Sequence, residues 1–231
     1  MEKVEDFERI KSYYDKFEMD RLFDRPLLNE LELLRFNRME YLCHEEEEMT
    51  HLMFFVEGKA KVFRTLMNGK SLLISIYGPF EIIGDVELIK GRSTSSNAQA
   101  LTTCYVLALN MEIARKTLGN DLTFLKFTCS VLAEKLHELG SSSSVNLYYP
   151  LENRLASYIL AVASPVKAEG QGEKRIFNEN LTHLAELMGT SYRHLLRTLN
   201  GLVQKEVITK NEKGYILRDE IALEKLAGDL F

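Results

Sequence analysis

The chain has 231 residues, of which 45% are hydrophobic, enough to form the core of one large domain or of two smaller ones. No apolar run approaches the length that crosses a membrane, and the N-terminus lacks the basic and apolar pattern of a secretion signal. Three widely spaced cysteines, Cys43, Cys104 and Cys129, are typical of reduced thiols and not of a disulfide framework or a metal site. We therefore expect a cytoplasmic protein.

The first 36 residues predict short helices, because Phe7, Ile10, Tyr14 and Phe17 recur three to four positions apart. From about Phe36 the pattern changes to short runs of strand-forming residues. The predicted strands cover residues 52–56, 60–64, 72–77, 99–101 and 105–109.

Two turn signals separate these strands. Glu57-Gly58-Lys59 predicts a hairpin between the first two runs, and Asn68-Gly69 is the strongest hairpin signal in the chain. Many short strands at this spacing favour a small barrel or sandwich. The four glutamates at positions 45–48 lack the spacing of a cation-binding loop, so we interpret them as a solvated loop.

A long helix follows the strands, and it has two apolar stripes. Its first stripe alternates steps of three and four residues: Leu122, Leu125, Cys129, Leu132, Leu136 and Leu139. Such a heptad seam continues to face the same way along the helix only when a partner helix lies against it. The pattern therefore favours a parallel homodimer through residues 122–139 over a helix buried in a monomer. The second stripe, Phe124, Phe127 and Val131, is expected to pack on the strand domain.

Three details of this region are predictions of their own. Cys129 on the seam would face its copy and can form an intersubunit disulfide on oxidation, although a small apolar seam residue is the simpler interpretation. Gly140 and the serines up to Ser144 predict a weakened or broken helix, a candidate hinge. A new helix is expected after Pro150, followed by a loop over residues 164–173.

Residues 180–204 predict two short helices that cross through a tight turn. Asn180 and Ser191 are good N-caps for the two helices, and Gly189 suits the left-handed backbone between them. The apolar positions at helical spacing are Leu181, Leu184, Leu187 and Met188 in the first helix and Leu195, Leu199 and Leu202 in the second. This pattern fits a helix-turn-helix, and the alternative is an ordinary helical hairpin in a core.

The next segment, residues 206–217, predicts a β-hairpin, which would complete a winged helix-turn-helix. Between residues 181 and 218 six basic residues face three acidic ones, a local balance of +3 in a chain of net charge −5. The basic residues are Arg193, Arg197, Lys205, Lys210, Lys213 and Arg218, and the acidic residues are Glu186, Glu206 and Glu212. A local basic patch is sufficient for a DNA-binding surface.

A strand-rich domain, a long helix and a winged helix in this order resemble the Crp/Fnr family of bacterial transcription regulators. The motifs that carry the resemblance are Gly84-Asp85-Val86-Glu87-Leu88, the strand over residues 100–109, and Gly189-Thr190-Ser191 continuing to Arg197. The similarity covers about residues 30–218. It implies an α+β fold with an N-terminal jelly-roll, a long dimerisation helix and a C-terminal winged helix-turn-helix.

The resemblance also divides the chain and implies a function. Residues 1–110 would form the effector-sensing jelly-roll with the N-terminal helices, residues 111–149 the dimerisation helix, and residues 150–231 the DNA-binding domain. The implied function is that of a homodimeric regulator that binds double-stranded DNA under the control of a small effector. An effector-binding module whose winged helix contacts protein remains the alternative.

The implied DNA-binding residues are Ser191, Tyr192, Arg193, His194 and Arg197. Ser191 matches a residue that contacts phosphate in the family, and Arg197 matches a base-reading arginine, which typically reads guanine. Tyr192-Arg193 stands where the family often has Arg-Glu, so the acidic reader is lost and the half-site is expected to differ.

The implied effector-binding residues are Gly84, Asp85, Thr94 and Ser95. Gly84-Asp85 matches the Gly-Glu pair whose carboxylate holds a ribose. Thr94-Ser95 stands where the family has an Arg-Ser pair on the cyclic phosphate, and without that arginine a charge-assisted contact is lost. The family's base-contacting Thr-Ser falls at Leu139-Gly140. We therefore expect an effector other than cyclic AMP.

The sequence assigns no cofactor and no metal ligand set. An iron–sulfur cluster needs four clustered cysteines, and this chain has three dispersed ones. No Ser-His-Asp or Cys-His set and no phosphate-cradling glycine loop is evident, so the protein is not expected to be an enzyme.

Overall fold

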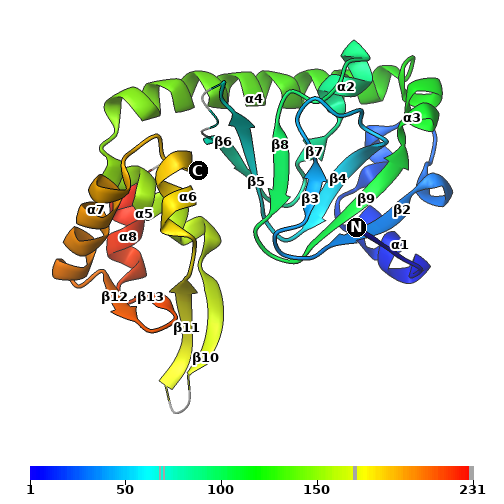
Figure 1. Ribbon diagram of the computed structural model, residues 1–231. Coiled ribbons are helices and arrows are strands. Elements are labelled where there is room, and N and C mark those ends of the chain that lie inside the picture. The colour runs from blue at the N-terminus through cyan, green and yellow to red at the C-terminus, as the bar shows by residue number, and fades with distance from the viewer. Residues whose placement is uncertain (68, 70, 169–170, 229–231) are drawn as a thin grey trace. The chain divides into compact units, whose positions relative to one another are not determined.

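The computed structural model describes residues 1–67, 69, 71–168 and 171–228, without side chains for residues 138–148, 167–168 and 171–173. The chain divides into two units (Figure 1). The first unit comprises residues 1–64 and 74–140, and the second comprises residues 65–73 and 141–231. No helix in the described part of the chain is both long and apolar enough to cross a membrane.

Two antiparallel sheets enclose the core of the first unit. One sheet has the strand order β1-β2-β9-β4-β7, with β1 Glu2–Val4, β2 Glu32–Phe36, β9 Cys104–Asn110, β4 His51–Glu57 and β7 Ile82–Ile83. The other has the order β3-β8-β5-β6, with β3 Tyr41–Cys43, β8 Asn97–Ala100, β5 Ala60–Thr65 and β6 Ser71–Tyr77. Residues of both sheets, such as Phe54 and Val62, belong to one buried core. This is the jelly-roll that the sequence predicted.

The segment Glu57-Gly58-Lys59 is a corner between the two sheets, which corrects the hairpin expected there. Strands β4 and β5 lie in different sheets and do not pair. Gly58 has φ +97°, and a Cβ at this position would meet the carbonyl oxygen of Thr103 at 2.4 Å. Glycine therefore permits the chain to pass close to the backbone that precedes β9. Strands β5 and β6 are neighbours in their sheet, as a hairpin between them predicts, while Asn68 of the expected turn lies outside the described residues.

The N-terminal segment is part helix and part strand, whereas the sequence predicted helices alone. Helix α1 Phe7–Lys16 buries Ile10 and Tyr14, and two 3-10 turns follow, η1 Met19–Leu22 and η2 Leu28–Glu30. Strands β1 and β2 pair at the edge of the larger sheet. The strand conformation is favoured over the local helical pattern because β2 also pairs with β9 in the sheet interior.

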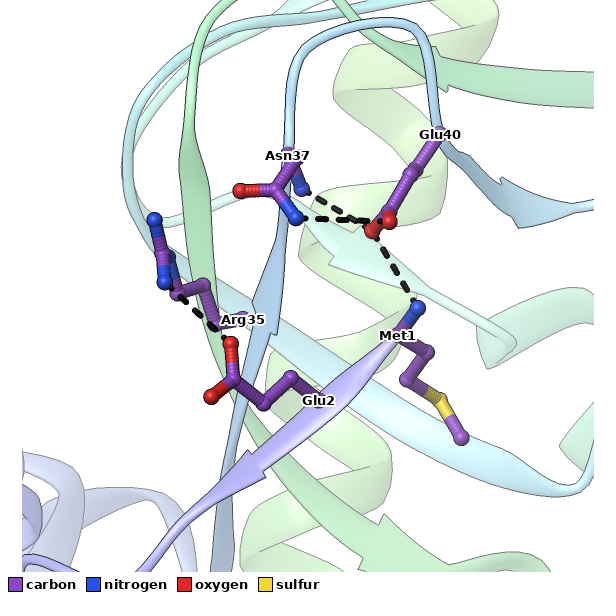
Figure 2. Close-up of polar contacts among 5 residues, drawn as sticks. All are labelled: Met1, Glu2, Arg35, Asn37 and Glu40. Carbon is purple, nitrogen blue, oxygen red and sulfur yellow. Dashed lines mark hydrogen bonds and ion pairs between the residues drawn. The ribbon is translucent and has the colours of Figure 1, made fainter.

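Polar contacts hold strand β1 at this edge (Figure 2). The Met1 ammonium lies 3.1 Å from Oε2 of Glu40, and Arg35 donates to Glu2 at 3.2 Å. The backbone N–H of Asn37 donates to the same Glu40 oxygen at 2.9 Å. This backbone hydrogen bond, followed by the N-terminal ammonium, lowers the pKa of Glu40.

Helices α2 Asp85–Lys90 and α3 Met111–Leu118 belong to the first unit, and helix α4 Leu122–Tyr148 lies in it up to residue 140. Phe124 of α4 is fully buried in the strand core, and Phe127 and Val131 pack against it, as the second apolar stripe predicted. Helix α4 continues through residues 140–144, where a weakened or broken helix was expected. The side chains of Leu139 and of the serines there lie outside the described residues.

The second unit is a winged helix. Its elements are α5 Leu151–Val162, β10 Ser164–Ala168, β11 Gln171–Phe177, α6 Leu181–Leu187, α7 Tyr192–Gln204, β12 Ile208–Asn211, β13 Gly214–Leu217 and α8 Glu220–Ala227. The strands form one sheet in the order β10-β11-β13-β12, which includes the predicted wing β12-β13. Residues 164–168 and 171–173 are strand, not the loop expected from Pro165 and the glycines. Proline is tolerated in β10 because this strand lies at the sheet edge.

Candidate nucleic-acid interface and sensor site

The turn between α6 and α7 is a Schellman motif centred on Gly189. The N–H of Thr190 donates to the carbonyl of Ala185 at 2.9 Å, and the N–H of Gly189 donates to that of Glu186 at 2.9 Å. Gly189 has φ +61°, the left-handed conformation that this motif requires. Arg154 of α5 adds a hydrogen bond at 3.0 Å to the carbonyl of Met188. These contacts end α6 and set the direction in which α7 begins.

Ser191 caps α7 and is the first of the predicted DNA-binding residues. Its hydroxyl accepts the N–H of His194 at 3.2 Å, and Nδ1 of His194 lies 3.2 Å from the hydroxyl of Thr190. Both side chains are therefore tied to the first turn of the helix. Leu195, Leu199 and Leu202 are fully buried on the opposite side, so α7 is held by one apolar face.

The other face of α7 is open and carries polar side chains beside Leu196. It lines a hollow of about 710 Å³ formed by Tyr192, Arg193, Leu196, Arg197, Asn200, Gly201 and Gln204. Tyr192 is 48% exposed. Within the described part of the chain, neither Arg193 nor Arg197 has a hydrogen-bond or ion-pair partner. The structure thus places three of the predicted DNA-binding residues, Tyr192, Arg193 and Arg197, on one accessible surface.

Two of the other basic residues of this region have partners in the fold. Nζ of Lys205 lies 2.6 Å from Oε1 of Glu152 in α5, and Nε of Arg218 donates to the hydroxyl of Thr209 at 2.9 Å. Lys210 and Lys213, in contrast, are exposed on the wing. The local charge of +3 therefore overstates the positive charge that is available to a ligand. The basic side chains that remain available lie on α7 and on the wing.

Gly84 of the predicted effector site is required by the backbone. Its φ is +97°, and a Cβ would meet the carbonyl oxygen of His51 at 3.0 Å and the methyl groups of Met49 and Met111 at 3.3 Å. Any other residue would be strained and crowded here. Gly84 positions Asp85, the first residue of α2, which is 3% exposed.

The carboxylate of Asp85 is paired with a lysine of the long helix. Nζ of Lys135 lies 2.9 Å from Oδ2 of Asp85, donates to the carbonyl of Ile82 at 2.7 Å, and lies 5.2 Å from the ring centroid of Tyr77. Burial lowers the pKa of Lys135, but Tyr77 and Asp85 outweigh burial and the net shift is upward. The ammonium therefore stays charged at neutral pH, and its stabilising effect is lost only as the pH rises through that raised pKa.

A second buried carboxylate, Glu87, lies in the same cluster and was missed from the sequence. Burial raises its pKa, and Asp85 adds to the rise, whereas the backbone amide of Ser95 and the charge of Lys135 lower it. The backbone amide of Ser95, a residue of the predicted effector site, therefore faces a carboxylate of the protein itself. Thr94 faces elsewhere: its hydroxyl donates to the carbonyls of His44 and Glu47 and so fastens the loop before β4.

The spacing of residues along α4 could have predicted that Lys135 is partly buried. Phe124, Thr128, Val131 and Lys135 follow one another by four, three and four residues, so they share one face of α4. Phe124 and Thr128 are buried, and a lysine on such a face needs a buried acidic partner. No group of three or more metal-ligating side chains gathers among the residues that the structure describes.

The described residues of the predicted seam of α4 are exposed or partly buried in the single chain. Leu122 is 59% exposed and Leu136 is 72% exposed, while Leu125 and Leu132 are partly buried and Cys129 is exposed. Cys104 is buried and Cys43 is partly buried, and burial raises the pKa of both thiols to about 11. These two thiols are therefore protonated and unreactive at neutral pH.

Comparison with known proteins agrees with this architecture. Residues 33–121 match the model of the cyclic nucleotide-binding domain, and residues 153–226 match that of the Crp-like helix-turn-helix domain. These two domains define a DNA-binding transcription regulator and not an enzyme.

Individual proteins show the same relationship. The regulatory protein YeiL of Escherichia coli O157:H7 is 33% identical over 195 residues, covering 84% of this chain and 85% of that protein. A CRP-like cAMP-activated global transcriptional regulator of Mycobacterium tuberculosis is 20% identical over 202 residues, covering 87% and 90%. The crystal structure of TTHB099, a CRP-family transcriptional regulator from Thermus thermophilus, has a TM-score of 0.66 at 21% identity, covering 85% of this chain and 97% of that one. The chain belongs to the Crp/Fnr family of transcription regulators.

The ion pair between Asp85 and Lys135 generates a stability prediction. Asp85→Asn keeps the size of the side chain but leaves the Lys135 ammonium buried without a countercharge. We expect the free energy of unfolding, measured by urea titration at pH 7, to fall by about 3–5 kcal/mol. Glu32→Gln is the matched control, because it removes an exposed ion pair with Lys3 and should cost at most about 1 kcal/mol. Equal losses in the two variants would contradict a structural role for the buried pair.

Proposed function

We propose that the protein is a homodimeric, sequence-specific DNA-binding transcription regulator whose jelly-roll senses a signal other than cyclic AMP. The observation that carries this proposal is the open face of α7, where Arg193 and Arg197 lack partners in the described chain and face outward from a capped, well-anchored helix. A helix of this kind fits the major groove, where side chains of its N-terminal turns reach base edges.

Each predicted DNA-binding residue has a role that its geometry supports. Arg193 and Arg197 are one turn apart on the open face and suit bidentate contacts with guanine. Tyr192, half exposed beside them, supplies a ring and a hydroxyl. Ser191 and His194, tied to the first turn, suit contacts with a phosphate that fix the orientation of the helix.

The exposed seam of α4 supports the proposed homodimer. Leucines that are 59% and 72% exposed in the single chain lie on a helix whose opposite face is already buried in the strand core. A second copy of α4 would cover this stripe, and two-fold symmetry would present two copies of α7 to two half-sites. We place this dimer in the cytoplasm, where its DNA target is accessible.

The charges around Asp85 support an effector that is not a cyclic nucleotide. Asp85 already pairs with Lys135, and Glu87 faces the amide of Ser95, so two carboxylates and one ammonium occupy this buried cluster. A phosphodiester placed here would meet carboxylates in place of the arginine that it requires. An effector that competes for Asp85 or Lys135 would change how α4 is held, and its preference between two arrangements would set the change in DNA affinity.

Arg197→Ala tests the DNA-binding proposal. We expect the affinity for the preferred DNA site to fall by about 5- to 150-fold, and the preference at one base pair to relax, because a guanine contact is lost. Fluorescence anisotropy on DNA selected from a random library measures both effects at fixed salt. Arg115→Ala, an exposed arginine of α3, should leave the affinity unchanged. A wild-type affinity that does not fall as salt rises would refute DNA binding and favour a winged helix that contacts protein.

Leu136→Glu tests the dimer. We expect the wild-type chain to have about twice its 26.6 kDa mass in light scattering. The variant should shift to the single-chain mass, because a charge would lie against its own copy in the seam. His137→Glu introduces the same charge one position away, on an exposed residue outside the seam, and should remain a dimer. A wild-type monomer, or the same shift in both variants, would argue against the seam as the interface.

The response to cyclic AMP tests the sensor proposal. A ligand at 100 times its Kd stabilises a folded protein by about 2.7 kcal/mol, which is readily seen as a rise in Tm. We expect no rise in Tm with cyclic AMP at millimolar concentration, because the buried carboxylates of Asp85 and Glu87 oppose a phosphodiester. Adenosine 5′-monophosphate serves as the control for unspecific adenine binding. A saturable rise with cyclic AMP alone would overturn this part of the proposal.

A further inference from the structure

Gly201 lies within α7, where glycine weakens the helix and the folded chain gives no reason for it. Glycine inside a helix is unfavourable relative to alanine because of its greater freedom in the unfolded chain. A Cβ built on Gly201 meets no atom within 4 Å. Gly58 and Gly214 differ, since a Cβ on either would meet a carbonyl oxygen at 2.4 Å. The packing of this chain therefore explains Gly58 and Gly214 but leaves Gly201 without a reason.

The surroundings of Gly201 are rich in hydrogen-bond donors. Gly201, Asn200 and Gln204 line the same hollow of about 710 Å³ as Arg193 and Arg197, on the open face of α7. Side chains on a helix lean towards its N-terminus, so Gln204, three residues further on, covers the surface beside Gly201. Amide and guanidinium groups therefore lie in the same hollow as the unsubstituted backbone of Gly201, together with Leu196 and the ring of Tyr192.

We infer that Gly201 is the point where the sugar-phosphate backbone of one DNA strand approaches the main chain of α7, with Asn200 and Gln204 as donors to a phosphate. Amide side chains are common phosphate donors, and a glycine marks positions where a ligand approaches the backbone closely. The two arginines on the same face attract a polyanion. This inference rests on the proposed DNA binding and assigns a phosphate subsite behind the base-reading first turns of the helix.

The inference predicts opposite effects of Gly201→Ala on stability and on binding. Alanine favours the helix and its methyl group has open space in the free protein, so Tm should rise by roughly 2–8 °C. In the complex the methyl group occupies the place of the DNA backbone, so the affinity should fall by roughly 5- to 100-fold. Because phosphate contacts carry no sequence information, selected and unrelated DNA should lose affinity alike. The salt dependence should stay unchanged, because Asn200 and Gln204 are neutral and their loss from a phosphate releases no counterion.

The experiment combines thermal unfolding of the full chain with anisotropy titrations at several salt concentrations. Gly78→Ala is the matched control, because Gly78 also has open space around an added Cβ but lies in the first unit, and its DNA affinity should be unchanged. Gly201→Leu should bind DNA still more weakly than Gly201→Ala.

The outcomes separate this inference from the function on which it rests. If the wild-type protein binds DNA and Gly201→Ala binds equally well or more tightly, the phosphate subsite is refuted while DNA binding stands. A fall in Tm would refute it as well, since the space at Gly201 would not be open. A loss confined to one DNA sequence would refute the assignment to phosphate. A wild-type protein without salt-dependent binding would overturn the proposed function itself.

Discussion

Helix α4 has two apolar faces, and the need to cover both of them from water underlies the rest of the structure. One face is buried by the strand core through Phe124 and is fastened by the ion pair between Lys135 and Asp85. The other face carries leucines that are exposed in the single chain. Contact of these side chains with water is unfavourable in free energy, and a second apolar surface that covered them would remove this cost. In the proposed dimer, a helix bound to the jelly-roll on one side and to its own copy on the other would join sensing and dimerisation in one element.

The same ion pair gives the sensor site its chemical character. The carboxylate of Asp85, which follows Gly84 in the proposed effector site, holds a lysine of the protein. Burial makes this pair expensive to form and more expensive to break, because removing either partner leaves a charge without compensation. Glu87 adds a second internal contact to this cluster, since its carboxylate faces the backbone amide of Ser95. The ion pair between Asp85 and Lys135 therefore links α2 to α4.

The recognition helix shows how stability and function make different demands on one element. Leu195, Leu199 and Leu202 bury its inner face, Ser191 caps it, and the motif at Gly189 sets its start. Its outer face instead keeps unpaired arginines and an interior glycine, neither of which stabilises the free protein. Residues that lower the stability of the folded chain and contact nothing within it indicate a binding partner outside the chain. The positive charge of the arginines on this face of α7 fits DNA as that partner.

Local patterns in the sequence were enough for the elements whose signals are short-range. Caps at Asn180 and Ser191, the glycine at the turn and the two stripes of α4 depend on residues within a few positions of one another, so the winged helix and the long helix were predictable. Tertiary structure decided what depends on distant partners. Glu57-Gly58-Lys59 resembles a hairpin turn but links two sheets, because β9 and β8 compete for β4 and β5. Lys135 pairs with Asp85, fifty positions away, and Thr94 turns to the loop at His44, contacts that no local pattern specifies because burial is set by the whole fold.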